Sequence, residues 1–318
     1  MSEETLVSAV IPTRNRPEIV CRAVRSALSQ TYKHLEIIVV VDGPNPSTVK
    51  ALHDLREPQL RIMTLSTSVG GSEARNIGVR VAKGEWIALL DDDDEWLPHK
   101  IATQVAISQN AKSKYAVIAC KYIDRRATGD MIRPQISHRP EQHISEYMFC
   151  ETSLFHPRQG ALQTSTLFIS RSLLLKFPFT TGLKRFQDVD WLLRSVPQTG
   201  TEVYIAPDIL SIYHNDQGSG RIGSSSDWRY LLHWAICNRG LFTVKAFSYF
   251  LSNNCFQIAL KSGPSYQAVL LLTKSCWRYG RYSPKVVWFF FKNAVLGTIA
   301  ISLSPPWLLK KISSFVYQ

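Results

Sequence analysis

The chain has 318 residues, of which 45% are hydrophobic, a composition that is ordinary for a folded protein. Its net charge of +12 is concentrated at one end, because residues 228–318 contain 11 lysines and arginines and no aspartate or glutamate. The six cysteines are scattered without a C-x-x-C pair, which argues against a disulfide framework or a zinc cluster.

Apolar runs and helical patterns alternate through the first hundred residues. Predicted strands cover residues 6–11, 35–41, 60–65 and 86–90. Predicted helices cover residues 17–30, 46–56, 72–83 and 97–110, and we expect Gly84 to end the third of them. This alternation predicts an α/β fold with a mostly parallel sheet flanked by helices on both faces. Ligands of such sheets bind beyond the carboxyl ends of the strands.

The remaining sequence divides into an irregular part and a helical part. We predict strands at residues 115–122, 166–169, 202–205 and 209–214, a helix at 188–194 and an irregular functional loop region at 123–160. Beyond Asp227 the pattern is helical, with aromatic and basic residues mixed. We therefore expect an α/β domain over residues 1–225 and a helical, basic region over residues 226–318.

Four consecutive aspartates, Asp91 to Asp94, directly follow the apolar run at residues 86–90. Adjacent carboxylates repel each other unless a cation lies between them. Such a run at the end of a buried strand favours a site for a hard divalent metal with oxygen ligands. Considered by itself, the quartet could alternatively be a solvated acidic turn that binds no metal.

Three other motifs lie where predicted strands end or a predicted helix begins. They are residues 10–16 (VIPTRNR), 37–43 (IIVVVDG) and 71–78 (GSEARNIG). Together with the acidic quartet, this ordered set closely resembles the family-2 glycosyltransferases over roughly residues 6–225. The resemblance implies the GT-A fold, an α/β fold that binds nucleotide sugars, and an inverting glycosyltransferase activity.

The resemblance also implies a role for each matching position in binding the nucleotide-sugar donor. Pro12 and Thr13, followed by Arg14, are expected to lie against the nucleotide base and ribose. Asp42 is expected to accept a hydrogen bond from the base, and Arg75 to help hold the donor.

The D-x-D positions of the family match Asp91 and Asp93. We expect Asp91 and Asp92 to contribute to donor binding and Asp93 to contact the metal directly, the metal being magnesium or manganese. The metal is expected to bridge the two donor phosphates and to stabilise the leaving nucleoside diphosphate.

Residues 187–194 (QDVDWLLR) resemble the E-D-x-D-x-x-x-R stretch of the family. Asp188 takes the place of the catalytic base, which removes a proton from the acceptor hydroxyl so that the anomeric centre is inverted. Gln187 replaces the usual Glu, which puts the role of that neighbour in doubt. Taken alone, an aspartate at the start of a helix also suits a capping or helix-dipole role.

His214 resembles the late histidine of the family and is expected to be a further metal ligand or a phosphate contact, although a lone histidine at a strand end also suits a structural role.

Two positions depart from the family pattern and bear on the contacts with the donor. Val41 stands where many members have an aspartate, and Ser68 stands where an asparagine is common.

Residues 218–223 match the dinucleotide pattern G-x-G-x-x-G, but the acidic residue that this pattern needs about 20 positions later is missing, because no acidic residue follows Asp227. We interpret the segment as a Gly/Ser-rich loop that closes over the donor or is simply mobile. Arg221 is positioned to touch the donor phosphates in the first case.

The most apolar stretch, residues 286–303, is interrupted by Lys292, Asn293 and Gly297, so it is marginal as a bilayer span. Aromatic residues mixed with lysine and arginine suit an anionic membrane surface. The alternative is an amphipathic helical subdomain that packs on the body. With reduced thiols and no visible signal peptide, we expect a cytoplasmic protein, peripheral on the inner face of the membrane.

The leading hypothesis is an inverting, metal-dependent glycosyltransferase that uses a nucleotide-diphosphate sugar and a lipid-linked or polysaccharide acceptor. A metal-dependent nucleotidyltransferase is an alternative, but residues 12–16 lack the glycine of its phosphate loop. A nucleotide triphosphatase needs a Gly-Lys dipeptide, which is absent. A non-enzymatic nucleic-acid-binding protein explains the basic region but not the carboxylates, so we expect a glycan or glycolipid partner and no nucleic acid.

Overall fold

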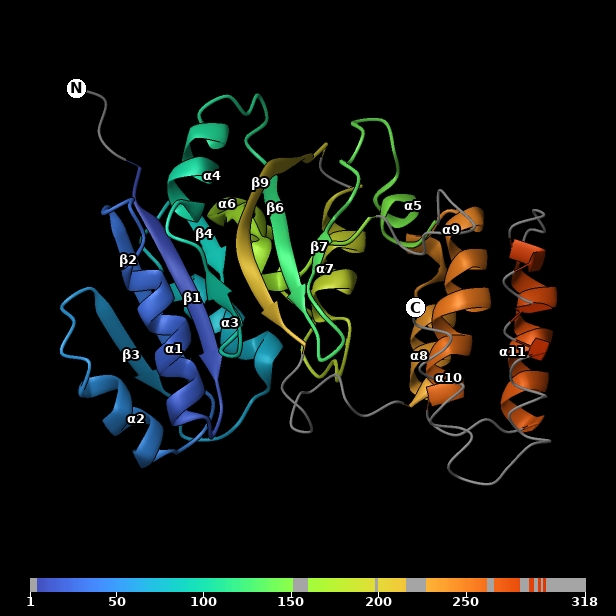
Figure 1. Cartoon of the computed structure of the whole chain (residues 1–318), viewed down its shortest axis with the longest axis horizontal. Helices are drawn as coiled ribbons and strands as arrows, with labels where there is room; N and C mark the ends of the chain where they lie inside the picture. The colour runs from blue at the N-terminus through green and yellow to red at the C-terminus, as the bar shows by residue number, and fades with distance from the viewer. Residues whose placement is uncertain are drawn as a thin grey trace. The chain divides into compact units, whose positions relative to one another are not determined.

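The computed structural model describes residues 5–150, 160–197, 200–215, 227–261, 266–280, 286–288, 291–292 and 294–295 (Figure 1). The chain forms two compact units. The first consists of residues 1–144 and 160–219, and the second of residues 145–159 and 220–318. The boundary predicted at residue 225 and the glycine-rich segment at 218–223 lie outside the described residues.

The first unit is built on a mixed sheet. Among the described residues its strands are β1 (Val7–Thr13), β2 (Leu35–Val41), β3 (Leu60–Thr64), β4 (Trp86–Leu89), β5 (Glu95–Trp96), β6 (Ala116–Arg125), β7 (Met131–Arg133), β8 (Phe168–Ser170) and β9 (Glu202–His214). Their order is β3-β2-β1-β4-β8-β6-β9-β5, with β7 beside β6. The first four are mutually parallel, β8 is antiparallel to both of its neighbours, and β9 is parallel to β6.

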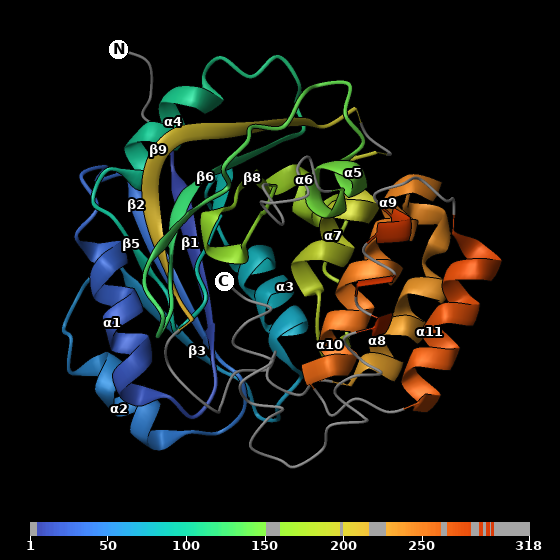
Figure 2. The ribbon, with the colours of Figure 1, turned by 45° about the vertical axis from the view of Figure 1, so that its right-hand side comes forward.

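Helices cover both faces of this sheet, as Figure 2 shows. The helices of the first unit are α1 (Pro17–Leu28), α2 (Pro46–His53), α3 (Gly71–Val81), α4 (Lys100–Ser108), α6 (Arg171–Lys176) and α7 (Gln187–Ser195). Val7, Ala9 and Ile11 of β1 share one buried cluster with residues of α1 and α4. Val10 points to the other face, where it meets Gly78 of α3. The predicted α/β architecture is therefore confirmed.

Gly84 does not end α3, so that expectation was wrong. The helix ends at Val81, and its C-cap Ala82 is already extended. Gly84 is required for a different reason: a Cβ atom there would lie 2.6 Å from the Ser8 hydroxyl and 2.7 Å from the Ser8 backbone nitrogen. The Gly84 backbone instead donates a hydrogen bond of 2.9 Å to that hydroxyl, which holds the start of β4 against β1.

Two other expectations need correction. The segment at 123–160 is not wholly irregular, because it contains the end of β6, strand β7 and helix α5 (Ile144–Phe149). The strands expected at 202–205 and 209–214 form one strand, β9, because the pairing with β6 continues through two register shifts, a smaller one between Ile209 and Ser211 and a larger one between Ala206 and Ile209. The larger shift accommodates Pro207, which cannot donate a ladder hydrogen bond.

The second unit is helical where the structure describes it. Its elements include α5, α8 (Trp228–Cys237), the 3-10 turn η3 (Arg239–Leu241), α9 (Val244–Tyr249), the π-helical turn η4 (Phe250–Cys255), α10 (Phe256–Lys261) and α11 (Tyr266–Tyr279). An aromatic cluster forms its core, with ring centroids 5.0–6.0 Å apart among Phe149, Trp234, Phe242 and Phe250. No helix in the described part of the chain is long and apolar enough to cross a bilayer.

Candidate active site

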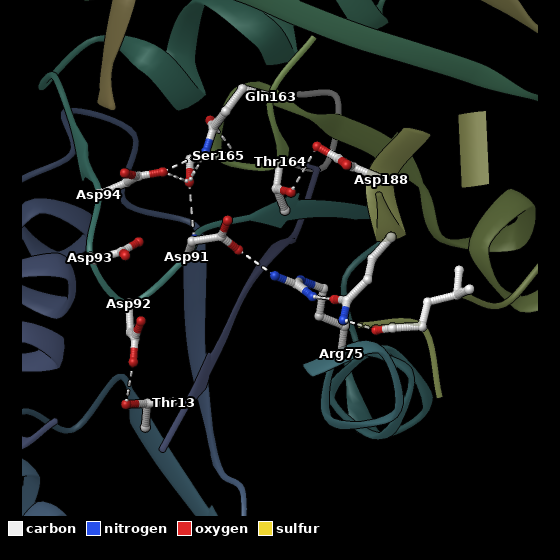
Figure 3. Close-up of polar contacts among 12 residues, drawn as sticks. Thr13, Arg75, Asp91, Asp92, Asp93, Asp94, Gln163, Thr164, Ser165 and Asp188 are labelled. Atoms are coloured by element: carbon white, nitrogen blue, oxygen red, sulfur yellow. Dashed lines mark hydrogen bonds and ion pairs between the residues drawn. The ribbon is translucent and has the colours of Figure 1, made fainter. Parts of the chain in front are cut away.

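The acidic quartet forms the loop between β4 and β5, at the carboxyl end of the parallel strands. Its four carboxylates point in different directions (Figure 3). The backbone turn is closed by a hydrogen bond of 3.1 Å from the Asp94 amide to the Asp91 carbonyl. The loop therefore separates four like charges instead of stacking them, which lowers their mutual repulsion.

Asp92 is tied to the end of β1. It accepts a hydrogen bond of 2.7 Å from the Thr13 hydroxyl, and its other oxygen lies 3.0 Å from Arg16 Nη1. Burial raises the pKa of Asp92 to about 6 despite the opposing effect of Arg16. Arg16 also lies 3.4 Å from the Asp93 carboxylate. One guanidinium therefore partly neutralises two members of the quartet.

Asp94 is a structural member of the quartet, because its side chain is fully buried. Its carboxylate accepts hydrogen bonds of 2.5 Å from Gln163 Nε2, 2.7 Å from the Ser165 hydroxyl and 3.2 Å from the His214 backbone amide. The Ser165 hydroxyl in turn accepts a bond of 3.0 Å from the Asp91 amide. Ser165 therefore joins the two ends of the acidic loop.

Arg75 connects Asp91 to the start of α7. Its Nη2 forms an ion pair with Asp91, and its Nη1 donates to the Gln187 side-chain oxygen at 2.7 Å. The guanidinium also lies over the ring of Phe179 at 5.8 Å from the ring centroid. Arg75 is largely buried, so its planar fork is held in one orientation at the end of the parallel strands.

Asp188 lies in the first turn of α7, next to Gln187. Its carboxylate accepts a bond of 2.8 Å from the Val189 amide and a weaker one of 3.4 Å from the Thr164 hydroxyl. Burial raises the pKa of Asp188 above the usual range of an aspartate, and the negative charge of Asp91 raises it further. Asp188 is not the N-cap, because that position is Phe186, which makes no side-chain capping bond.

The predicted donor-contacting residues occupy the ends of β1 and β2. Pro12 and Thr13 are buried, and Arg14 is exposed. Asp42 holds the loop before α3: it accepts 2.9 Å from the Ser68 hydroxyl, 2.6 Å from the Val69 amide and 3.0 Å from the amide at residue 70. Both Asp42 oxygens are therefore occupied by the loop, and its contact with a base stays a prediction.

His214 ends β9 close to the quartet, and its side chain is buried. Its Nε2 lies 2.6 Å from a carboxylate oxygen of Glu95. Within the described ranges, no cluster of three His, Cys, Asp or Glu side chains is arranged to hold a metal ion. A metal-ligand role for His214 would use Nδ1, or Nε2 after it leaves Glu95, and that role stays a prediction.

Sequence reasoning missed the residues that support the acidic loop. The sequence prediction assigns no role to the segment at 163–166 (QTST). Its polar side chains directly precede an apolar strand, which is the signal that could have revealed it. Arg22 of α1 was also missed. It donates 2.8 Å to the Asp93 carbonyl and lies 3.4 Å from Glu95.

Comparisons with known proteins identify the family of the chain. The profile of Glycosyl transferase family 2 matches residues 8–169, and the chain belongs to this family. It is a glycosyltransferase, and its relatives include enzymes of polysaccharide biosynthesis.

Three curated relatives illustrate the range of similarity. The putative colanic acid biosynthesis glycosyl transferase WcaA of Escherichia coli (strain K12) is 29% identical over 71% of this chain and 78% of its own length. The amylovoran biosynthesis glycosyltransferase AmsB of Erwinia amylovora is 23% identical over 84% and 90%. The UDP-Glc:alpha-D-GlcNAc-diphosphoundecaprenol beta-1,3-glucosyltransferase WfaP of Escherichia coli is 35% identical over 34% of this chain and 43% of its own length.

Solved structures support the predicted GT-A fold. S. aureus TarS 1-349, in complex with UDP-GlcNAc, aligns with a TM-score of 0.56 and 15% identity over 93% of this chain and 91% of that chain. The mannosyltransferase PcManGT from Pyrobaculum calidifontis, in complex with GDP-Man and Mn2+, aligns with a TM-score of 0.55 and 17% identity over 94% and 87%. At these identities the likeness concerns the fold alone.

Proposed function

We propose that the protein transfers a sugar, with inversion, from a nucleotide-diphosphate sugar to a hydroxyl of a lipid-linked or cell-surface polysaccharide acceptor. The observation that carries this proposal is the connection between Asp91 and the helix start that bears Asp188, made by Arg75 and Gln187. It brings the acidic loop and a partly buried carboxylate with a raised pKa to one end of the sheet.

Asp188 acts as the general base. It removes the proton from the acceptor hydroxyl, the freed oxygen attacks the anomeric carbon, and the bond from that carbon to the phosphate oxygen breaks. The nucleoside diphosphate leaves with the electron pair of the broken bond. Because attack and departure occur on opposite faces of the sugar, the product is inverted. The raised pKa of Asp188 makes its carboxylate a stronger base than an exposed aspartate.

The donor is held at the carboxyl ends of β1, β2 and β4. Thr13 and Arg16 reach this edge from the end of β1, and Arg75 reaches it from α3. Guanidinium groups suit phosphate oxygens, which they bind in a planar, two-pronged manner. Asp42 fixes the loop at residues 68–70, and in this account that loop forms one wall of the nucleotide site.

The donor set fits a magnesium or manganese ion. Asp91 and Asp93 present hard carboxylate oxygens from one loop, and magnesium is typically bound by one or two carboxylates together with substrate phosphates. When bound, the ion offsets the charge that develops on the leaving diphosphate. Asp93 is our choice for direct contact, with His214 as a further ligand.

A lipid-linked acceptor is supported by the relative whose name specifies a diphosphoundecaprenol-linked sugar, WfaP, and by the second unit of this chain. Leu270 and Trp288 of that unit are 68% and 54% exposed. Residues 228–318 carry no acidic side chain to oppose their lysines and arginines. Exposed apolar side chains among basic ones suit the surface of an anionic membrane.

The function is tested by incubating the full chain with a panel of nucleotide sugars, with and without manganese, and by analysing released nucleotide and product stereochemistry. We expect release of a nucleoside diphosphate from one donor, dependent on the metal, and an inverted product when an acceptor is supplied. A retained configuration would contradict the role of Asp188. Release of pyrophosphate from a nucleoside triphosphate would instead favour a nucleotidyltransferase.

Membrane contact is tested by co-sedimentation with anionic vesicles. Replacement of Leu270 and Trp288 by serine is expected to reduce the bound fraction severalfold. Leu175→Ser is the matched control, because Leu175 is a comparably exposed apolar residue, at 45%, in the first unit. An unchanged bound fraction in the double variant, or an equal loss in the control, would contradict membrane contact through the second unit.

A further inference from the structure

The second unit contains a cavity of about 340 Å³, a volume within the range of small-ligand pockets. One wall is formed by Thr273, Cys276 and Trp277 of α11 and by Gly280 just after it, which follow the helical spacing of three and four residues. The facing wall includes Val287 and Phe291. The cavity lies wholly within the second unit and is separate from the acidic loop and Asp188.

The walls of this cavity are apolar. Its two hydroxyl side chains donate to the backbone of their own helices: Ser248 to the Val244 carbonyl at 2.7 Å, and Thr273 to the Val269 carbonyl at 2.6 Å. Burial raises the pKa of the Cys276 thiol to about 12, so this wall carries no charge. Apolar cavities bind water poorly and hydrocarbon well. The chemistry of the lining therefore selects a hydrocarbon ligand.

The cavity communicates with the protein surface. Trp277 and Phe291 both line it, yet they are 78% and 59% exposed. A side chain that is exposed on one side and borders a cavity on the other stands at the opening. A long, thin ligand can therefore place its apolar end inside while its other end stays in solvent.

The charges around the opening have one sign. Lys274 is exposed and lies between Thr273 and the following turn of α11, at the edge of the face that lines the cavity. Residues 228–318 contain no aspartate or glutamate. The nearby cation Lys245 is already paired with Glu146 at 3.1 Å. The solvent-facing end of the ligand therefore carries negative charge.

We propose that this cavity binds the hydrocarbon chain of a single amphiphile whose head group is anionic, with Lys274 beside the head group. The proposal goes beyond the transfer reaction and beyond adsorption to a membrane, because it predicts saturable binding of one chain by the dissolved protein. Neither sugar transfer nor the identity of the donor enters it, so it can fail while the proposed function stands, and the reverse.

The experiment uses the full chain and a dansyl-labelled undecanoic acid, at concentrations below those at which the probe aggregates. Probe fluorescence is expected to rise to a plateau with one probe per chain. Thr273→Phe and Val287→Phe fill the cavity from its two walls and are each expected to weaken probe binding by about tenfold or more. Leu271→Phe is the matched control, because Leu271 lies on the opposite side of α11 and does not line the cavity. It is expected to bind like the wild type.

Competition by unlabelled compounds tests the head group. Decyl phosphate is expected to displace the probe at lower concentrations than decanol, and high salt is expected to reduce that difference. Circular dichroism identifies variants that keep their helices, and two filling variants are used so that one can fail to fold. A wild type without saturable binding, or filling variants that bind like Leu271→Phe, would overturn the proposal. Equal competition by decanol and decyl phosphate would overturn the anionic head group.

Discussion

Arg75 and Gln187, 112 residues apart in the chain, are joined by a hydrogen bond of 2.7 Å from the guanidinium to the side-chain amide oxygen. The same guanidinium forms an ion pair with Asp91. Because Gln187 immediately precedes Asp188, one arginine sets the position of the proposed base relative to the acidic loop. Because Gln187 is neutral, the positive charge of Arg75 is balanced by Asp91 alone and is not divided between two carboxylates.

The pH dependence of transfer follows from the raised pKa of Asp188. A general base works only when deprotonated, so the rate falls as the pH falls through that pKa. Burial, assisted by Asp91, raises the pKa, so the acid limb of kcat/KM is expected above the range of an ordinary aspartate, whose pKa is about 3.9. The measurement is kcat/KM against pH, and an acid limb at or below that ordinary range would contradict the assignment.

Gln187→Glu adds a negative charge beside Asp188, and a like charge raises the pKa of a carboxyl group. The acid limb of kcat/KM is therefore expected to move to higher pH. Gln109→Glu is the matched control, because Gln109 is an exposed residue just after α4 and its replacement makes the same charge change. An acid limb of kcat/KM that moves by the same amount in both variants, or that moves to lower pH in Gln187→Glu, would contradict a direct effect on Asp188.

Asp93→Asn is expected to abolish transfer and to weaken donor binding, because the change removes a charged oxygen from the proposed metal site. Calorimetric titration of the donor with and without manganese measures the second effect. We expect the gain in donor affinity from manganese to disappear in this variant. A variant that keeps the manganese effect and wild-type turnover would remove Asp93 from the metal site.

Ser165 supports the acidic loop from both ends, since its hydroxyl accepts from the Asp91 amide and donates to Asp94. Ser165→Ala leaves a buried amide and a buried carboxylate each without one partner, at a cost of about 1–3 kcal/mol in the free energy of unfolding. Turnover is expected to fall as the loop loses its fixed geometry. Thermal unfolding and kcat are the measurements.

Ser170→Ala is the matched control for Ser165→Ala. Ser170 ends β8 and is buried, but its hydroxyl has no hydrogen-bond partner among the described residues. Its replacement is expected to change stability and turnover little. If the two variants behave alike, the loss in Ser165→Ala comes from packing and not from the hydroxyl bonds to the acidic loop.

Lys100 provides a prediction for stability, because its side chain is fully buried, with Nζ 2.7 Å from Gln104 Oε1 and 4.4 Å from the ring centroid of Trp96. Burial lowers its pKa to about 8. Between that value and the ordinary lysine value of about 10.4, the unfolded chain binds more protons than the folded chain, so stability rises with pH. The expected gain across this window is about 3 kcal/mol.

Urea unfolding at a series of pH values between neutral and strongly alkaline measures this gain. Lys100→Met is expected to lose this gain in stability, because no buried lysine remains that must lose its proton on folding. Lys50→Met is the control, because Lys50 is exposed on α2 and is expected to leave the gain unchanged. A wild-type stability that falls steadily across this window, or a gain that survives in Lys100→Met, would show that Lys100 does not titrate as described.

The strands that carry the site could be predicted from the sequence alone. Residues 37–41 are an unbroken run of isoleucine and valine, so β2 and its position before Asp42 could be predicted. The same holds for β4 and the acidic quartet. These features depend on neighbours in the chain, and local patterns report them directly.

The partners of the quartet could not be predicted, because they come from distant segments. Ser165 is 71 residues from Asp94, and Glu95 is 119 residues from His214. No local pattern specifies such pairs. The same reason explains the misassigned role of Gly84, whose requirement comes from the approach of β1 and not from the end of its own helix.

The role of Asp188 as the general base is tested most directly by the rate of transfer by Asp188→Asn, measured together with the affinity of this variant for the donor. The substitution keeps the shape of the side chain and removes its basicity. We predict that kcat falls by about 10²–10⁴, the usual contribution of a general base, while donor affinity and the folded structure are retained. Near-wild-type turnover by this variant would contradict the account.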